Sequence, residues 1–212
     1  MPKLFRCLAL SLALVFAASA PSFAATPAET FVQTNVDRGL AILNNTSLSK
    51  AQRQDQFRGF LTTLTDLKRI ALYTLGPARR TASPADQAAF VDAFKEYAFA
   101  VYGAEFAKYS GQTLKVIGSV QRAPGDELVR TQLIDPTASK GQEPIEVDFR
   151  VYGSGGHYNV VDIIVAGLDL AITEQDDFSS FLAQHNENIR ALIDNLHTRA
   201  ERIRATGEVS GG

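Results

Sequence analysis

The spacing of apolar residues changes near residue 112, and this change constrains the fold more than any other feature of the sequence. Before it, apolar residues recur every three to four positions, as in amphipathic helices. After it, four segments have the pattern of strands, at 113–120, 128–134, 145–152 and 158–165. Their connectors are rich in Gly, Pro and Asp and shorter than the roughly twelve residues that a parallel crossover needs. The sequence therefore predicts a curved antiparallel sheet of about four strands.

Helical segments precede and follow the predicted strands. Thr26 and Ser83 each stand before a proline and can cap a helix, so helices are expected to begin there. Another helical segment begins near Ser49, and the helical pattern also covers residues 66–75 and 173–204. Helices on both sides of an antiparallel run predict an α+β fold, with helices packed on one face of the sheet.

The longest predicted helix, residues 84–109, is apolar around most of its circumference. A helix that packs against one neighbour needs a single apolar stripe, so this helix should be covered from two sides. Gly103 lies inside it and predicts a kink or a close backbone approach, because Gly is unfavourable in a helix interior. The two stripes are Phe90, Phe94, Tyr97 and Val101, and Val91, Ala98, Tyr102, Phe106 and Tyr109.

The third and fourth strands each have one apolar face. The third alternates strictly between apolar and charged residues from 145 to 151, which indicates one buried and one wet face. In the fourth, the same alternation places Asp162 on the wet face, hydrated or hydrogen-bonded. Close-packed cores use the same residue types as cavity walls, so ordinary core is the favoured interpretation of any one of these residues, and the pattern alone does not separate a filled interior from a hollow one. The apolar faces comprise Val147, Phe149 and Val151, and Val161, Ile163 and Val165.

The first 24 residues have the pattern of an export signal. Two basic residues precede an apolar run over 8–18, and Ser22-Phe23-Ala24 is a small-x-small cleavage site, with a cut after Ala20 as the alternative. The apolar run is shorter than the roughly 20 residues that span a bilayer. We therefore expect a signal peptide at 1–24, one domain at 25–205 and a flexible tail at 206–212.

Several classes of function lack their residues in this chain. The one cysteine, Cys7, lies in the predicted signal peptide, so the mature protein should have no disulfide, thiol nucleophile or thiolate metal ligand. The signal also holds two of the 21 basic residues, which leaves 19 against 23 acidic residues, a formal charge of −4. This charge argues against nucleic-acid binding. His157, His185 and His197 lack a metal-site spacing, and the Gly-rich segment 153–156 joins two strands instead of opening a helix. We expect no metal, no cofactor and no enzymatic activity.

Three segments resemble one protein family. The first is the fourth strand with its exit, where Tyr158 precedes a β-branched core around Asp162, and Gly167 and a polar turn lead to Phe178. The second is Leu75-Gly76-Pro77-Ala78-Arg79-Arg80-Thr81-Ala82 followed by Gln87 and Phe90; the third is the long helix with Phe94, Tyr102 and Tyr109. In this order they resemble the MlaC-type, or toluene-tolerance auxiliary, family of periplasmic phospholipid carriers, over roughly residues 27–203.

The resemblance implies a fold and a function. The implied fold is a cone like that of nuclear transport factor 2, with an added helical lobe and an apolar cavity between a curved sheet and the helices. Proteins of this kind shuttle phospholipid between an outer-membrane lipoprotein–porin complex and the lipid-binding ring of an inner-membrane ABC transporter. Some relatives accompany hopanoid-lipid genes, so a polycyclic lipid is a variant cargo. Where the family has Tyr-Arg in its final turn, this chain has Glu174-Gln175, which leaves headgroup preference and docking face open.

The resemblance and the apolar stripes together predict the site. Arg79 and Arg80 are the candidates for the headgroup, because Arg suits bidentate contact with oxyanions, and an exposed loop pair is the alternative. Two other functions stay open: a small-molecule isomerase or hydratase that uses Asp162 or Asp148, and an interaction module with a filled core. The predicted lipid-binding residues are Phe90, Phe94, Tyr97, Val101, Tyr102, Phe106, Val147, Phe149, Val151, Val161, Ile163 and Val165.

Overall fold

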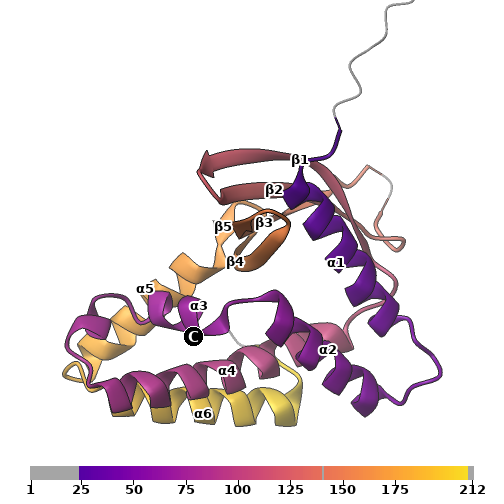
Figure 1. Cartoon of the computed structure of the whole chain (residues 1–212). Helices are drawn as coiled ribbons and strands as arrows, with labels where there is room; N and C mark the ends of the chain where they lie inside the picture. The colour runs from indigo at the N-terminus through magenta and orange to yellow at the C-terminus, as the bar shows by residue number, and fades with distance from the viewer. Residues whose placement is uncertain (1–23, 140, 210–212) are drawn as a thin grey trace, which may run out of the picture.

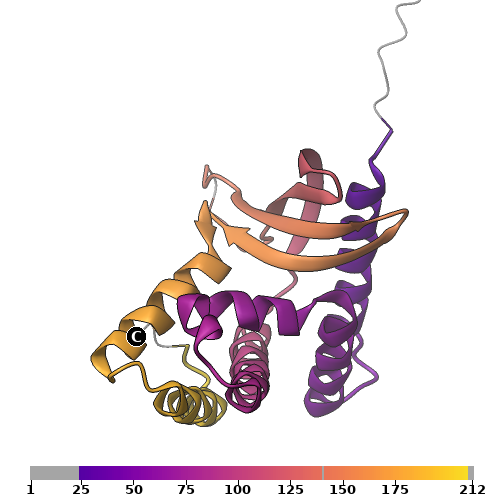
Figure 2. The same cartoon turned by 60° about the vertical axis from the view of Figure 1, so that its left-hand side comes forward.

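An antiparallel sheet curves over a layer of helices (Figures 1 and 2). The structure is a computed structural model, and it describes residues 24–139 and 141–209. The predicted signal peptide therefore lies outside the described residues, apart from Ala24. The helices are α1 (Pro27–Leu43), α2 (Lys50–Leu64), α3 (Leu67–Thr74), the 3₁₀ helix η1 (Gly76–Arg80), α4 (Pro84–Ala107), α5 (Leu170–Gln184) and α6 (Ile189–Thr206). The strands are β1 (Thr113–Ala123), β2 (Asp126–Ile134), β3 (Ile145–Ser154), β4 (His157–Val165) and β5 (Leu168–Asp169).

The sheet has its strands in sequence order, each antiparallel to the next. The predicted α+β class and the antiparallel sheet are confirmed. The predicted number of about four strands is one too few, because the two-residue β5 pairs with the end of β4. Ala166 and Gly167 turn the chain with positive φ angles of 50° and 81°. A two-residue strand after such a turn is too short to leave a periodic pattern in the sequence.

Helix caps begin the helices where the sequence predicts. Thr26 accepts a hydrogen bond from the backbone N–H of Glu29, whose carboxylate accepts one from the backbone N–H of Thr26. Ser49 and Gln52 form the same reciprocal pair at the start of α2. The C-terminal helical stretch consists of two helices, α5 and α6, which are divided where Asn186 and Glu187 have φ angles of 54° and 56°. Asn adopts this conformation more readily than most residues, but the apolar spacing continues across the break and does not show it.

The strand β4 contains a β-bulge that changes which residues face the helices. Val160 pairs with Val151 and Asp162 pairs with Arg150, so Val161 has no partner in the register. The alternation predicts Val161 on the apolar face, but the structure places the buried Val160 there instead. Beyond the bulge, Ile163 pairs with Phe149 and returns to that face.

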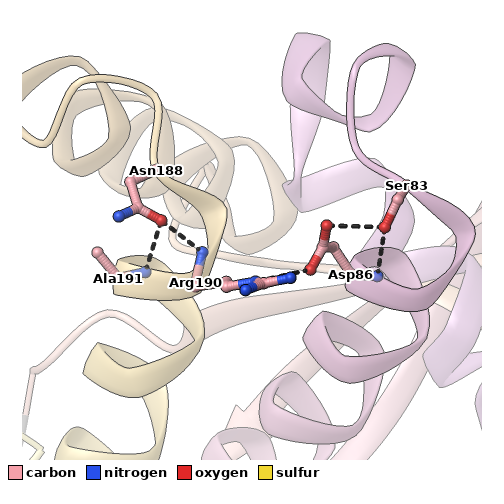
Figure 3. A network of polar contacts seen from close by, with 5 residues as sticks. All are labelled: Ser83, Asp86, Asn188, Arg190 and Ala191. Carbon is pink, nitrogen blue, oxygen red and sulfur yellow. Dashed lines mark hydrogen bonds and ion pairs between the residues drawn. The ribbon is translucent and has the colours of Figure 1, made fainter.

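The helices α4 and α6 lie parallel and side by side (Figure 1). Their N-terminal ends are joined by the network in Figure 3: Asp86 accepts a 2.7 Å hydrogen bond from the Ser83 hydroxyl and pairs with Arg190 at 3.3 Å. Asn188 caps α6 by accepting hydrogen bonds from the backbone N–H groups of Arg190 and Ala191. The helix α4 also packs against α3, so it is covered from two directions, as its apolar circumference predicts.

The buried apolar residues form two separate clusters. One joins α3, α4, α5 and α6, with Phe90, Phe178 and Leu196 at its centre. The other joins α1 to the concave face of the sheet through Val32, Val129, Val151 and Val160. Partly buried residues of both clusters, such as Tyr102, Phe149 and Ile163, lie between these cores. The space between them holds the cavities described below.

The chain after α6 contacts the helical layer at one residue. Gly207 ends α6 in the left-handed conformation, with φ of 72°. Val209 then packs against the cluster formed by α3, α4, α5 and α6 and is half-buried. Of the predicted tail at 206–212, Thr206 is the last residue of α6, Val209 contacts the helical layer, and residues 210–212 lie outside the described residues.

Candidate functional site

Three cavities meet at Tyr102, which lines all of them. The first, here the sheet cavity, lies between α1, α2 and the sheet and has a volume of about 220 Å³. The second, the edge cavity, lies between α3, α4, α5 and β4 and has a volume of about 260 Å³. The third, the basic cavity, lies between α2 and the C-terminal halves of α4 and α6 and has a volume of about 350 Å³. The space between the sheet and the helices is therefore not completely filled by side chains.

The sheet and edge cavities share part of their lining. Both are lined by Tyr102, Val160 and Ile163, so they share a wall at the bulge of β4. The sheet cavity has no charged residue among the described residues that line it. Its walls come from α1 (Phe31, Val32, Asn35, Val36, Gly39, Leu40 and Leu43), from α2 (Phe57, Phe60, Leu61 and Leu64) and from the sheet (Leu114, Phe149, Val160 and Ile163), with Tyr102 of α4.

The predicted site residues are divided between lining and core. Phe94, Tyr97, Val101, Tyr102 and Ile163 line the edge cavity, Phe149 lines the sheet cavity with Tyr102 and Ile163, and Phe106 lines the basic cavity.

The remaining predicted residues line none of these three cavities. Phe90 and Val151 are fully buried in the two cores. Val147, Val161 and Val165 are strand residues away from the lining. Arg79 and Arg80 are exposed on η1, so the structure does not bring the two predicted headgroup residues to any of the three cavities.

Walls from α1 and α2 were missed by the sequence reasoning. The signal was present, because Phe57, Phe60, Leu61 and Leu64 form an apolar stripe at helical spacing. Such a stripe is equally typical of a helix that packs on a filled core. Only the positions of α1 and α2 relative to the sheet distinguish the two cases, and these positions depend on contacts far apart in the sequence.

A polar cluster closes one side of the edge cavity. The Tyr97 hydroxyl lies 3.1 Å from Glu174 Oε1 and accepts a 2.9 Å hydrogen bond from Arg199, which also donates to Asp177 at 2.7 Å. The Arg199 guanidinium lies 4.6 Å from the centre of the Tyr97 ring, a cation–π contact. Burial raises the pKa of Glu174, whose Oε2 is buried without a hydrogen-bond partner among the described residues. This cavity therefore has an apolar wall and an acidic one.

Asp162 is buried and hydrogen-bonded, so of the two expected environments the structure shows the hydrogen-bonded one and not the hydrated one. By register it shares the face of Arg150, as predicted, but it lies at the edge of β4 between the bridge to Thr65 and the pairing with β5. Its Oδ1 accepts hydrogen bonds from the backbone N–H groups of Ile163 at 2.8 Å and Ala171 at 3.3 Å. Burial and the neighbouring Asp169 raise the pKa of Asp162 to about 6. The residue thus joins the sheet to the start of α5.

Gly103 faces open space, contrary to the expected close approach. A Cβ built there would meet no atom within 4 Å, because Gly103 lines the basic cavity. Gly103→Ala should therefore stabilise the protein by about 0.5–1 kcal/mol, since Ala is the better helix former. Thermal denaturation measures the change. Gly39→Ala is the matched control in α1: its Cβ would lie 3.3 Å from Phe60 Cε1, so it should give no gain, and equal stabilisation by both would contradict this explanation.

Two further properties of the described residues bear on function. They contain no group of three or more His, Cys, Asp or Glu residues placed to hold a metal ion. Among the helices of residues 24–139 and 141–209, none combines the length and apolarity needed to cross a membrane.

Comparisons with known proteins agree with this architecture. The family model described as "MlaC protein" matches residues 33–198. Among solved structures, a phospholipid-binding protein from Ralstonia solanacearum, determined in complex with a phospholipid, superposes with a TM-score of 0.72. The match covers 83% of this chain and 98% of that chain, at 24% sequence identity. At this identity the likeness establishes a shared fold.

Proposed function

We propose, because this chain belongs to the MlaC protein family, that it is a periplasmic carrier which shields the acyl chains of a phospholipid from water. The observation that carries the proposal is the pair of adjacent, mainly apolar cavities between the concave sheet and the helices, which share three lining residues. The Ralstonia solanacearum protein of the same fold binds a phospholipid, which supports the same ligand class here. We infer a binding protein and not an enzyme.

Shielding hydrocarbon requires an apolar space of some length. A diacyl lipid has about 30 methylene groups at about 0.8 kcal/mol each, so roughly 20 kcal/mol opposes carrying it through water unshielded. Hydrogen bonds of about 1 kcal/mol each would not offset this. The sheet and edge cavities share Tyr102, Val160 and Ile163, and together they reach the range of about 300–1,000 Å³ that is usual for small-molecule sites.

A lipid with two long chains needs more room, and α2 is the wall best able to yield. Of its 15 residues, Phe60 alone is buried. An outward movement of α2 would enlarge the sheet cavity without disturbing the core that joins α3, α4, α5 and α6. This movement belongs to the proposal and explains how cavities of this size could accept a complete phospholipid.

Mass spectrometry of the protein purified with its own export signal tests the proposal. We expect near-stoichiometric phospholipid in native spectra and in organic extracts. A polycyclic lipid in place of phospholipid would change the cargo but keep the carrier function. Persistently empty protein under mild purification would contradict the proposal.

The transport role follows from family membership and needs its own test. We propose that the carrier moves lipid in the periplasm between an outer-membrane lipoprotein–porin complex and the lipid-binding ring of an inner-membrane ABC transporter. Cell fractionation and cross-linking in living cells should find the mature chain in the periplasm, bound at different times to each complex. A cytoplasmic location would exclude this role.

One observation favours the alternative of a small-molecule isomerase. Asp162 lines the edge cavity, and its pKa of about 6 would suit a general base. Its Oδ1, however, is already used by two backbone N–H groups, and Asp148 lines none of the three cavities. Turnover of a small substrate that disappears in Asp162→Asn would favour the isomerase.

A further inference from the structure

The three cavities that meet at Tyr102 differ in charge. The sheet cavity has no charged lining residue, and the edge cavity has two carboxylates, Asp162 and Glu174. The basic cavity has three cations, Lys50, Arg58 and Arg204, and no acidic residue among the described residues that line it. Each cavity therefore favours a different part of an amphipathic ligand.

The cations of the basic cavity surround an apolar floor. Lys50 and Arg58 lie on the face of α2 that also carries Phe57 and Leu61, and these two apolar residues line the sheet cavity as well. The Arg58 guanidinium lies 5.6 Å from the centre of the Phe99 ring. A ligand at this position could thus have its charged end among the cations and its apolar end directed past Tyr102.

Two of the three cations are available for an anion. Arg204 contacts Glu96 at 3.6 Å, which partly neutralises it. Within the described part of the chain, neither Lys50 nor Arg58 forms an ion pair with an acidic side chain. Arg and Lys bind phosphate oxygens through charge-assisted hydrogen bonds, which are stronger than neutral ones. The acidic residues of the chain outnumber its basic ones, yet the charged residues that line this cavity, among those described, are all cations, which favours an anionic ligand.

We propose that the phosphate of the bound phospholipid lies in the basic cavity, between Lys50, Arg58 and Arg204. The glycerol backbone then lies near Tyr102, and the two acyl chains enter the sheet cavity and the edge cavity. This inference rests on the proposed function. The acidic side chains of the edge cavity, when ionised, would repel a phosphate, which disfavours the opposite orientation.

A competition between two lipids with the same acyl chains tests the inference. Lipid-free protein is incubated with phosphatidylcholine vesicles that contain equal amounts of dioleoyl phosphatidylglycerol and dioleoylglycerol, re-isolated, and extracted for mass spectrometry. The two probes differ in the presence of a phosphate-linked headgroup. Wild-type protein should prefer the phospholipid, and Lys50→Gln combined with Arg58→Gln should lower the ratio of phosphatidylglycerol to dioleoylglycerol about tenfold.

The substitutions suit this test because they spare the fold. Both residues are exposed on α2, and Gln forms helices about as well as Lys and Arg. Arg202→Gln is the matched control: Arg202 is exposed on α6, two residues from Arg204, and lines none of the three cavities. The control should keep the wild-type ratio. High salt should lower the wild-type ratio towards that of the double variant, because it screens exposed charges.

The outcomes separate this inference from the proposed function. If the double variant binds lipid with an unchanged ratio, the inference is wrong and the carrier function stands. If wild-type protein takes up neither probe lipid nor phosphatidylcholine, both fail. Free phosphate is the other source of the same chemistry, so inorganic phosphate is titrated into lipid-free protein and the amide signals of α2 are followed by NMR. Saturable binding of phosphate alone, together with an unchanged lipid ratio in the double variant, would assign the cations to a free anion and overturn the inference.

Discussion

Ile163→Asp should remove at least nine-tenths of the bound phospholipid while the protein stays folded. Ile163 lines both the sheet cavity and the edge cavity and is only partly buried, so the substituted carboxylate can keep some water. A carboxylate beside hydrocarbon loses hydration without gaining a partner. A penalty of about 1.4 kcal/mol already weakens binding tenfold, and a charge at the wall that both cavities share should exceed it. Lipid extraction and native mass spectrometry measure the loss, with circular dichroism as the check on folding.

The same substitution at Ile172 is the control. Ile172 is 45% exposed in the first turn of α5, where an acidic residue is favourable, so Ile172→Asp should keep its lipid. Normal lipid loading in a folded Ile163→Asp protein would contradict the position of the acyl chains. Phe94→Asp is the obvious choice from the sequence but a poor test. Phe94 is 5% exposed and packs against Phe90 and Phe178, so a charge there would disrupt the helical core.

Asp162→Asn should stabilise the protein at pH 8 by up to about 3 kcal/mol and leave its stability near pH 4 almost unchanged. The pKa of Asp162 is raised from 3.8 to about 6 in the folded state, first by burial and second by Asp169. The folded state therefore holds this proton more tightly than the unfolded state. The resulting stability is fully present below about pH 4 and is lost as the pH rises through about 6. Asparagine cannot ionise, and its side-chain oxygen can still accept from Ile163 and Ala171.

Denaturant unfolding of both proteins between pH 4 and pH 8 measures this effect. The difference in free energy of unfolding between variant and wild type should grow with pH. Its full size corresponds to about 1.4 kcal/mol for each unit by which folding raises the pKa of Asp162. Asp92→Asn is the control, since Asp92 is exposed on α4, and it should keep the pH dependence of the wild type. A variant that is less stable than wild type at every pH would mean that both Asp162 oxygens are needed as a carboxylate.

Local features of the fold could be predicted from the sequence, and features set by distant contacts could not. The caps at Thr26, Ser49 and Ser83 act within four residues, so the helix starts follow from the sequence alone. The short connectors likewise determine that neighbouring strands are antiparallel. The bulge at Val161 leaves no pattern in β4, because every residue from Val160 to Val165 except Asp162 is β-branched and apolar. A one-residue shift is invisible in such a run.

The candidate site was predictable in part for the same reason. The two stripes of α4 indicated that residues such as Phe94 and Tyr102 would face different neighbours, and both line cavities. The sequence could not separate Phe90, which fills the core, from Phe94, four residues on, which borders a cavity. It also could not assign Lys50, Arg58 and Arg204 to one place, since α2 and α6 lie about 150 residues apart in the chain. Arg79 and Arg80 were conspicuous only because they are adjacent.

The bulge in β4 determines to which face of the sheet the side chains after it point. If residues 160–163 formed a regular strand with no bulge, 160 and 163 would point to opposite faces, because they are three residues apart. Deletion of Val161 would leave residues 160, 162 and 163 opposite 151, 150 and 149 as a regular strand, so the strand should keep its sidedness and lose the local bend and twist of the bulge.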